Sequence, residues 1–148
     1  MQLEIRNLCC TYADGAQALE DVSLTIPPGL NGLSGPRGAG KSTLLRILAA
    51  LQPADRGSVR LGAIDVLRQP DEIRKSLGYL PQEPAAIPAV IAEDLLAHLA
   101  LLRGMVRHWQ RREVVEAVLR RVGLWEVRRQ SLGGYSRALR MRFRLAAA

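Results

Sequence analysis

The chain has few of the residues that mark disulfide-bonded or metal-binding proteins. Its 148 residues include two cysteines, Cys9 and Cys10, and two histidines. The cysteines are adjacent within a predicted strand, where neighbouring side chains point to opposite faces. They therefore suit neither an ordinary disulfide nor a metal site. We interpret them as strand residues of a protein from a reducing compartment.

The sequence also lacks a long hydrophobic run. No apolar stretch approaches about 18 residues and no signal peptide begins the chain, so we expect neither a membrane span nor export. The apolar fraction of 48% is normal for a globular protein and argues against disorder. The length corresponds to about one domain.

Lysine is scarce, and the positive charge is uneven. Nineteen of the 21 basic residues are arginine, and residues 103–148 hold twelve basic against three acidic residues. Residues 1–102 hold nine basic and eleven acidic residues. A basic half is compatible with nucleic acid or an anionic surface. Because the arginines are spread over predicted helices, we interpret them as solvated helix faces and expect no nucleic-acid partner.

One glycine-rich segment has the spacing of a phosphate-binding loop. It consists of Gly35, Pro36, Arg37, Gly38, Ala39, Gly40, Lys41, Ser42 and Thr43. Glycines let backbone N–H groups approach phosphate oxygens, Lys41 would reach the β- and γ-phosphates, and the Ser42 hydroxyl would ligate Mg²⁺. An apolar helical pattern follows it, which favours a P-loop over an ordinary glycine-rich turn.

The apolar periodicity changes from strand-like to helical along the chain. Strands are predicted at residues 3–12, 22–26, 29–34, 59–61 and 78–82. Helical segments are predicted at residues 42–51, 73–77, 91–102, 108–122 and 136–148, with Ser136 as a helix cap. This order predicts a β-rich nucleotide core followed by a helical lobe.

With the P-loop, Gln82 and the segment Gly133-Gly-Tyr-Ser136 in this order, the chain resembles the ATPase domain of ATP-binding cassette (ABC) transporters. The resemblance covers all 148 residues. It implies an α/β P-loop NTPase fold of ABC type, with a β-rich nucleotide core and a helical subdomain. We expect one partial domain over 1–148, with the core at 1–88 and the helical subdomain with its signature helix at 89–148.

The resemblance assigns roles to two residues outside the P-loop. Tyr12 corresponds to an aromatic residue that stacks on adenine, and the segment Gly78-Tyr-Leu-Pro-Gln-Glu83 is similar to the Q-loop. Its glutamine, Gln82, would meet Mg²⁺ and the attacking water. The implied cofactors are ATP and Mg²⁺, with Ser42 and Gln82 as metal ligands.

The signature motif of the family, Leu-Ser-Gly-Gly-Gln, fits in two registers. Ser131-Leu-Gly-Gly-Tyr135 keeps both glycines but has a leucine at the serine position. Tyr135-Ser-Arg-Ala-Leu139 keeps the serine and replaces the glycines. We favour the second register, because the arginines and the Leu-Ala pair that follow then match the family pattern. It implies that Ser136 touches the γ-phosphate of ATP bound to a partner subunit.

Members of this family continue past the signature helix into the Walker B strand and a switch histidine. The printed chain has no carboxylate after Glu126, and its histidines lie in the helical lobe. The resemblance therefore implies an N-terminal fragment whose nucleotide core lacks its C-terminal part. The resemblance implies that the fragment comes from an ABC-type ATPase, but we expect the fragment alone not to hydrolyse ATP.

The resemblance implies an ATP-binding subunit that couples ATP hydrolysis to solute export through a membrane permease. The segment Leu77-Gly-Tyr-Leu-Pro-Gln82 is similar to that of exporter subunits. A second ATPase subunit, as a homodimer, and the permease are the expected partners, which would hold the chain at the cytoplasmic face of the membrane. Two alternatives stay open: a non-catalytic nucleotide-binding or regulatory P-loop module, and a soluble ABC protein acting on nucleic acid or the ribosome.

Overall fold

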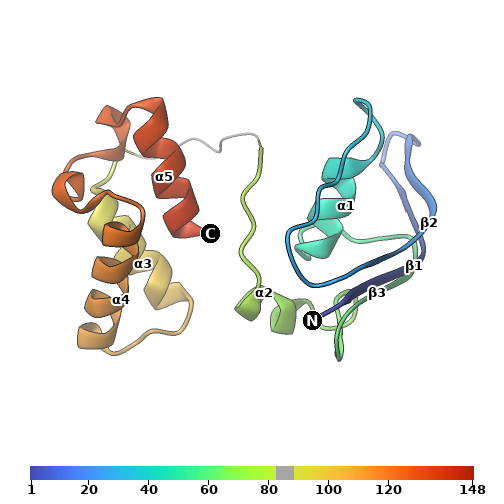
Figure 1. Ribbon diagram of the computed structural model, residues 1–148, viewed down its shortest axis with the longest axis horizontal. Coiled ribbons are helices and arrows are strands. Elements are labelled where there is room, and N and C mark those ends of the chain that lie inside the picture. Colours follow the sequence, from blue (N-terminus) through green and yellow to red (C-terminus); the bar gives the residue numbers. More distant parts are fainter. Residues whose placement is uncertain (83–88) are drawn as a thin grey trace. The chain divides into compact units, whose positions relative to one another are not determined.

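The computed structural model describes residues 1–82 and 89–148, which form two compact units. The first unit is Met1–Gly78 and the second is Tyr79–Ala148 (Figure 1). The predicted boundary between the nucleotide core and the helical subdomain, at residues 88 and 89, adjoins the segment 83–88, which lies outside the described residues. Glu83 of the predicted Q-loop lies in the same segment. Each unit is described below by itself.

The first unit is a four-stranded antiparallel sheet with the strand order β2-β1-β3-β4. The strands are β1 (Leu3–Thr11), β2 (Gln17–Ile26), β3 (Arg56–Leu61) and β4 (Ile64–Asp65). Helix α1 (Lys41–Leu48) contributes Leu44 and Ile47 to the core on the sheet, and helix α2 (Pro70–Ser76) contributes Ile73. Burial of these apolar side chains stabilises the unit by removing their surface from water.

A bulge in β1 explains how Ile5 and Leu8, three residues apart, both reach the core. Strict alternation would place them on opposite faces of the sheet. The pairing with β2 shifts between these two residues, and Asn7 has a φ of 47°. Its side-chain amide donates to Asp21 Oδ1 at 2.8 Å, and its backbone N–H donates to Ser23 Oγ at 2.8 Å. Because of the extra residue in the bulge, the side chain of Leu8 points toward the same core as that of Ile5.

The adjacent cysteines lie in β1 as predicted, and both are buried and free. The Cys9 sulfur accepts hydrogen bonds from the Asp21 backbone N–H at 3.2 Å and from Arg56 Nε at 3.0 Å. The Cys10 sulfur accepts from the Gln52 side chain at 3.2 Å. Their burial agrees with the interpretation of both residues as part of the strand packing.

Two predicted strands are wrong. Residues 29–34, directly before the P-loop, and residues 78–82 have no strand conformation. Strand conformation is stabilised by a hydrogen-bonded neighbour, and the sheet described in the first unit contains neither segment. Residues 27–34 are exposed throughout, including Leu30 and Leu33. The apolar residues that suggested a strand therefore face solvent.

The second unit is helical and matches the predicted order closely. It contains α3 (Ala92–Leu102), α4 (His108–Arg121), the 3₁₀ turns η1 (Trp125–Val127) and η2 (Leu132–Gly134), and α5 (Arg137–Ala147). Its core is formed by inward-facing residues of these elements: Ala92, Leu96, Ala100, Val115, Leu119, Leu124, Leu132, Tyr135 and Phe143. None of the helices in the described ranges has the length and hydrophobicity required to cross a membrane.

Candidate nucleotide-binding site

The P-loop ends at the first residue of α1. Gly40 is the N-cap of this helix, with a φ of 75°, and Gly38 has a φ of 82°. Residues with side chains rarely adopt these left-handed conformations, so the loop depends on glycine at both places. The first N–H groups of a helix have no partner within it. Since Gly40 has no side chain to cap them, they are suited to an anion, which the helix dipole also favours.

Gly40 also sets where the loop lies on the sheet. A Cβ atom built on it would be 2.3 Å from the Ala18 carbonyl oxygen and 2.7 Å from Leu19 Cδ2. Both neighbours belong to β2, so the start of α1 packs directly against that strand. No side chain fits between them. The glycine is therefore required both by its conformation and by the close approach of two backbones.

Lys41 folds back over the loop that precedes it. Its ammonium donates hydrogen bonds to the carbonyl oxygens of Gly35 at 2.8 Å and Pro36 at 2.5 Å. The charge is thus held against the backbone of the loop that would bind a phosphate group. Ser42, the next residue, is exposed, so its hydroxyl is accessible to a metal ion. These two side chains and the glycine backbone fit a nucleotide phosphate with a divalent cation.

The structure brings Tyr12 from the end of β1 to the start of α1. Its hydroxyl and the Thr43 hydroxyl lie 2.5 Å apart, and either can donate the hydrogen bond. Thr43 is 3% exposed, whereas Tyr12 is 38% exposed. The threonine hydroxyl therefore holds the tyrosine in place beside the P-loop. The tyrosine ring remains accessible for stacking on a base.

Thr43 was predicted as a binding residue, but its fixed contact with Tyr12 was not. The two residues are far apart in the sequence, and nothing in the local pattern around either one indicates a hydrogen bond. The contact with Ala18 at Gly40 was missed for the same reason. Both depend on how β1 and β2 are positioned beside α1.

Gln82 and Ser136 belong to the second unit, so their meeting with the P-loop stays a prediction. Gln82 is exposed and is the last residue of the non-strand segment 78–82. Ser136 is the N-cap of α5, and its hydroxyl oxygen accepts from the Leu139 backbone N–H at 3.3 Å. The predicted helix cap at Ser136 is confirmed.

The register of the signature segment that begins at Tyr135 stays a prediction, and the structure shows where the residues of both registers lie. In the other register Leu132 takes the serine position, but its side chain is completely buried. In the favoured register, Arg137 and Ala138 form the exposed first turn of α5. Their side chains occupy the positions at which the family pattern has glycine.

Tyr135 anchors this segment in the core of the second unit. It is 2% exposed, and its hydroxyl donates to the Val127 carbonyl oxygen at 2.8 Å. Burial raises the pKa of the Tyr135 phenol, because the ionised form loses its hydration. The Arg140 guanidinium donates to the backbone carbonyls of Tyr135 at 2.8 Å and Gly133 at 3.0 Å. These contacts fix the turn that leads into α5.

The glycine-rich loop, the lysine above it and the helix that follows define a P-loop nucleotide-binding protein. A family model described as "ABC transporter" matches residues 19–148. The chain therefore belongs to the ABC transporter family and represents its nucleotide-binding domain. The sheet and helices have the mixed α/β fold expected from the sequence.

Relatives support this family membership. The chain is 31% identical to the ABC transporter ATP-binding protein NatA of Bacillus subtilis, over 89% of this chain and 54% of that protein. It is 36% identical to the phosphate import ATP-binding protein PstB of Tropheryma whipplei, over 88% and 54% of the two chains. It is 33% identical to the daunorubicin/doxorubicin resistance ATP-binding protein DrrA of Streptomyces peucetius, over 99% and 44%.

A solved structure has the same fold. It is described as an ATP-binding subunit of an ABC transporter, and it aligns over 100% of this chain and 61% of that chain with a TM-score of 0.74 and 21% identity. The chain spans about half the length of the curated relatives that it matches.

Proposed function

We propose that this chain is the nucleotide-binding part of an ABC transporter subunit that binds ATP with Mg²⁺ and drives solute export through a membrane permease. The observation that carries the proposal is the P-loop: Gly40 begins α1 against β2, and the Lys41 ammonium lies over the loop. Phosphate would be held by the backbone N–H groups and Lys41, and Mg²⁺ by the Ser42 hydroxyl.

Tyr12 would provide the base-binding surface of the same site. Its exposed ring stands beside the P-loop and is held by Thr43. Stacking of an aromatic side chain on a nucleobase contributes about 1–3 kcal/mol and tolerates different bases. The site would therefore recognise the triphosphate more strongly than the base.

The proposed roles of Gln82 and Ser136 require groups outside the P-loop site: the attacking water for Gln82 and a second subunit for Ser136. Gln82 would contact Mg²⁺ and the attacking water, and Ser136 would reach ATP bound to a second, identical subunit. The printed chain carries no carboxylate after Glu126 that could act as the general base of the family. We therefore expect these 148 residues to bind ATP without turning it over.

Export rather than import is also part of the proposal. It rests on the Gly78-Tyr-Leu-Pro-Gln82 segment and on the similarity to the drug-resistance protein DrrA along nearly the whole chain. The similarity to the phosphate import protein PstB covers a smaller part. The permease would hold the subunit at the cytoplasmic face of the membrane.

The two lysines of the chain provide a matched test of nucleotide binding. Lys41 lies at the P-loop, and Lys75 pairs with Glu72 on the surface of α2 at 2.7 Å. In a titration with fluorescent ATP, Lys41→Ala should weaken binding at least about tenfold, whereas Lys75→Ala should leave it unchanged. Equal affinity for the two variants would contradict the proposed site.

A further inference from the structure

The tip formed by α3 and α4 exposes an unusual set of apolar side chains. We define this tip as residues 101–112, which comprise the end of α3, the connecting loop and the first turn of α4. Leu101, Leu102, Val106 and Trp109 are 41%, 70%, 74% and 59% exposed. Single exposed apolar residues are common, but four within twelve residues indicate a contact surface.

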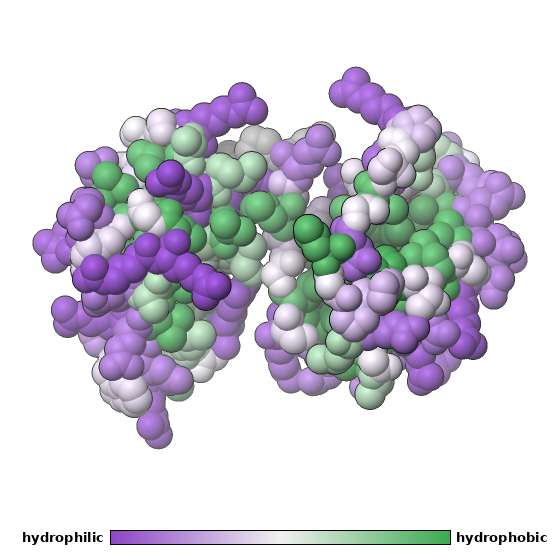
Figure 2. All heavy atoms as spheres, in the orientation of Figure 1, coloured by the Kyte–Doolittle hydropathy of each residue, from purple (hydrophilic) through white to green (hydrophobic). Residues whose placement is uncertain are grey.

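The charge of the tip has one sign. It contains the basic residues Arg103, Arg107, His108, Arg111 and Arg112. No acidic residue lies between Asp94 and Glu113. Figure 2 shows hydrophilic and hydrophobic residues interspersed on the visible face of the second unit. A contact surface that combines arginine with exposed aliphatic and aromatic side chains fits an anionic partner that also has an apolar phase.

Hydrogen bonds hold the tip in this conformation. The Arg111 guanidinium donates to the carbonyl oxygens of Met105 at 3.0 Å and Val106 at 3.3 Å. The Met105 backbone N–H donates to the Ala100 carbonyl oxygen at 3.0 Å, and the Arg103 guanidinium donates to the backbone oxygen of Ala148 at 2.7 Å. The exposed apolar side chains are therefore presented by an ordered turn.

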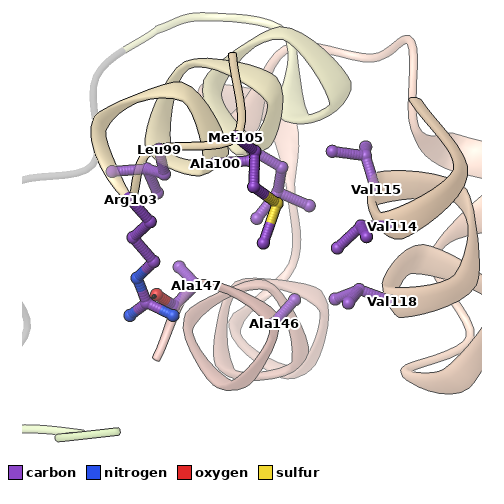
Figure 3. A pocket seen from close by; sticks show the side chains of 10 residues that line it. Leu99, Ala100, Arg103, Met105, Val114, Val115, Val118, Ala146 and Ala147 are labelled. Carbon is purple, nitrogen blue, oxygen red and sulfur yellow. Dashed lines mark hydrogen bonds between the residues drawn. The ribbon is translucent and has the colours of Figure 1, made fainter. Parts of the chain in front are cut away.

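The turn changes from an inward-facing side chain at Met105 to an exposed one at Val106. Its side chain points into a hollow between α3, α4 and α5, as Figure 3 shows, together with Val114 and Val118 from α4. The hollow has a volume of about 90 Å³. This is well below the roughly 300 Å³ of a small-molecule site, so it serves packing rather than ligand binding. Met105 faces inward, whereas Val106 beside it remains exposed.

We propose that this tip is a direct contact for the anionic phospholipid surface of the membrane. The arginines would attract lipid phosphates, and each one near a charged surface strengthens binding about fivefold. Trp109 would lie at the level of the headgroups, where its ring and N–H are both accommodated, and Leu102 and Val106 would enter the acyl boundary. A protein partner would need both an acidic and an apolar surface here, which an anionic bilayer supplies by itself.

The contact goes beyond the proposed function, because it requires neither a permease nor ATP. In the proposed function the permease brings the chain to the membrane; the tip would add a second attachment directly to lipid. The two tryptophans allow a direct test. Trp125, in the same unit, has the Arg120 and Arg128 guanidiniums over its ring, 4.3 and 3.8 Å from the ring centroid.

The experiment uses the 148-residue chain with one tryptophan at a time. Trp125→Phe leaves Trp109 as the reporter, and Trp109→Phe leaves Trp125. Each variant is mixed with vesicles of phosphatidylglycerol and phosphatidylcholine in equal parts, or of phosphatidylcholine alone. We expect Trp109 emission to shift to shorter wavelength and to be quenched by bromine-labelled lipid in the anionic vesicles only. Trp125 should show neither effect.

Charge variants test which arginines attract the lipid. The double variant Arg107→Gln, Arg112→Gln should weaken vesicle binding about fivefold for each arginine removed. The matched control Arg121→Gln, Arg129→Gln removes the same charge from exposed positions outside the tip and should stay within about twofold of the unmodified chain. The variant Leu102→Ser, Val106→Ser keeps Trp109 as the reporter and should abolish its quenching by labelled lipid.

Several results would overturn the proposal. These are no binding to anionic vesicles, binding in which Trp109 stays accessible to water, or equal weakening by both arginine pairs. A shift of Trp109 emission that depends on protein concentration without vesicles would instead identify a contact between copies of the chain. The comparison of Lys41→Ala with Lys75→Ala measures ATP binding without any lipid. A negative result for the lipid contact therefore does not contradict the proposed function.

Discussion

The Tyr12 hydroxyl and the buried Thr43 hydroxyl lie 2.5 Å apart and join the end of β1 to the first turn of α1. Because of this contact, the tyrosine has two effects that mutation can measure separately. Its hydroxyl holds the ring in place, and its ring face would bind the base. Variants that remove one or both should differ in nucleotide affinity.

Tyr12→Phe should lower the free energy of unfolding by about 1 kcal/mol, because the Thr43 hydroxyl loses its partner. Nucleotide affinity should change little, since the ring remains. Tyr12→Ala should weaken ATP binding about tenfold or more through loss of stacking. Urea unfolding and a fluorescent ATP titration measure the two effects. Equal affinities for the Phe and Ala variants would show that the ring does not contact the base.

Gly40→Ala should destabilise the chain much more than Gly38→Ala. Both glycines have positive φ angles, which cost an alanine about 1–2 kcal/mol. Only at Gly40 would the new Cβ also meet backbone, 2.3 Å from the Ala18 oxygen, whereas nothing lies within 4 Å of one at Gly38. Thermal unfolding of the two variants measures the difference. Similar melting temperatures would show that α1 can move away from β2 at little cost.

Ser136→Ala should reduce stability by about 1 kcal/mol, because the hydroxyl caps the eleven-residue helix α5. Ser131→Ala is the matched control: its hydroxyl accepts from the Gly133 backbone N–H at 3.3 Å but precedes only the three-residue turn η2. Denaturant unfolding should therefore show a smaller effect for Ser131. The reverse order would contradict the assignment of Ser136 as the principal cap of this segment.

The stability of the chain should fall as the pH rises above about 10, in part because of Tyr135. Burial raises the pKa of this phenol, so the folded chain retains the proton that the unfolded chain releases. The stabilising contribution is complete below the unfolded pKa and is lost as the pH rises through the folded pKa. Tyr135→Phe should therefore show a weaker decline in unfolding free energy over this pH range. If the unfolding free energies of the unmodified chain and of Tyr135→Phe fell in parallel with pH, Tyr135 would not be a cause of the decline.

Some features followed from the sequence because they depend on local spacing. The P-loop from Gly35 to Thr43, the helix after it and the two amphipathic helices of the second unit each have a short periodic pattern. Their positions agree with α1, α3 and α4 to within a few residues. The cap at Ser136 was also evident, because a serine before a helical pattern has a local physical role.

The predicted strand at residues 29–34 failed because strand formation depends on neighbours that local sequence does not specify. The apolar residues Leu30 and Leu33 suggested a strand, yet these residues are exposed and outside the sheet described in the first unit. The bulge at Asn7 was hidden for a related reason. Its positive φ is stabilised by hydrogen bonds to Asp21 and Ser23, which only the folded hairpin brings close.

The sequence by itself determined the family, the phosphate-binding loop and the order of the helices, because each is encoded in residues close together along the chain. Only the tertiary structure decided that Thr43 holds Tyr12 and that β2 leaves no room for a side chain at Gly40. It also decided that Met105 turns inward while Val106 remains exposed. These relationships depend on the packing of separate elements, and packing is set by the shape of the whole core rather than by any short pattern.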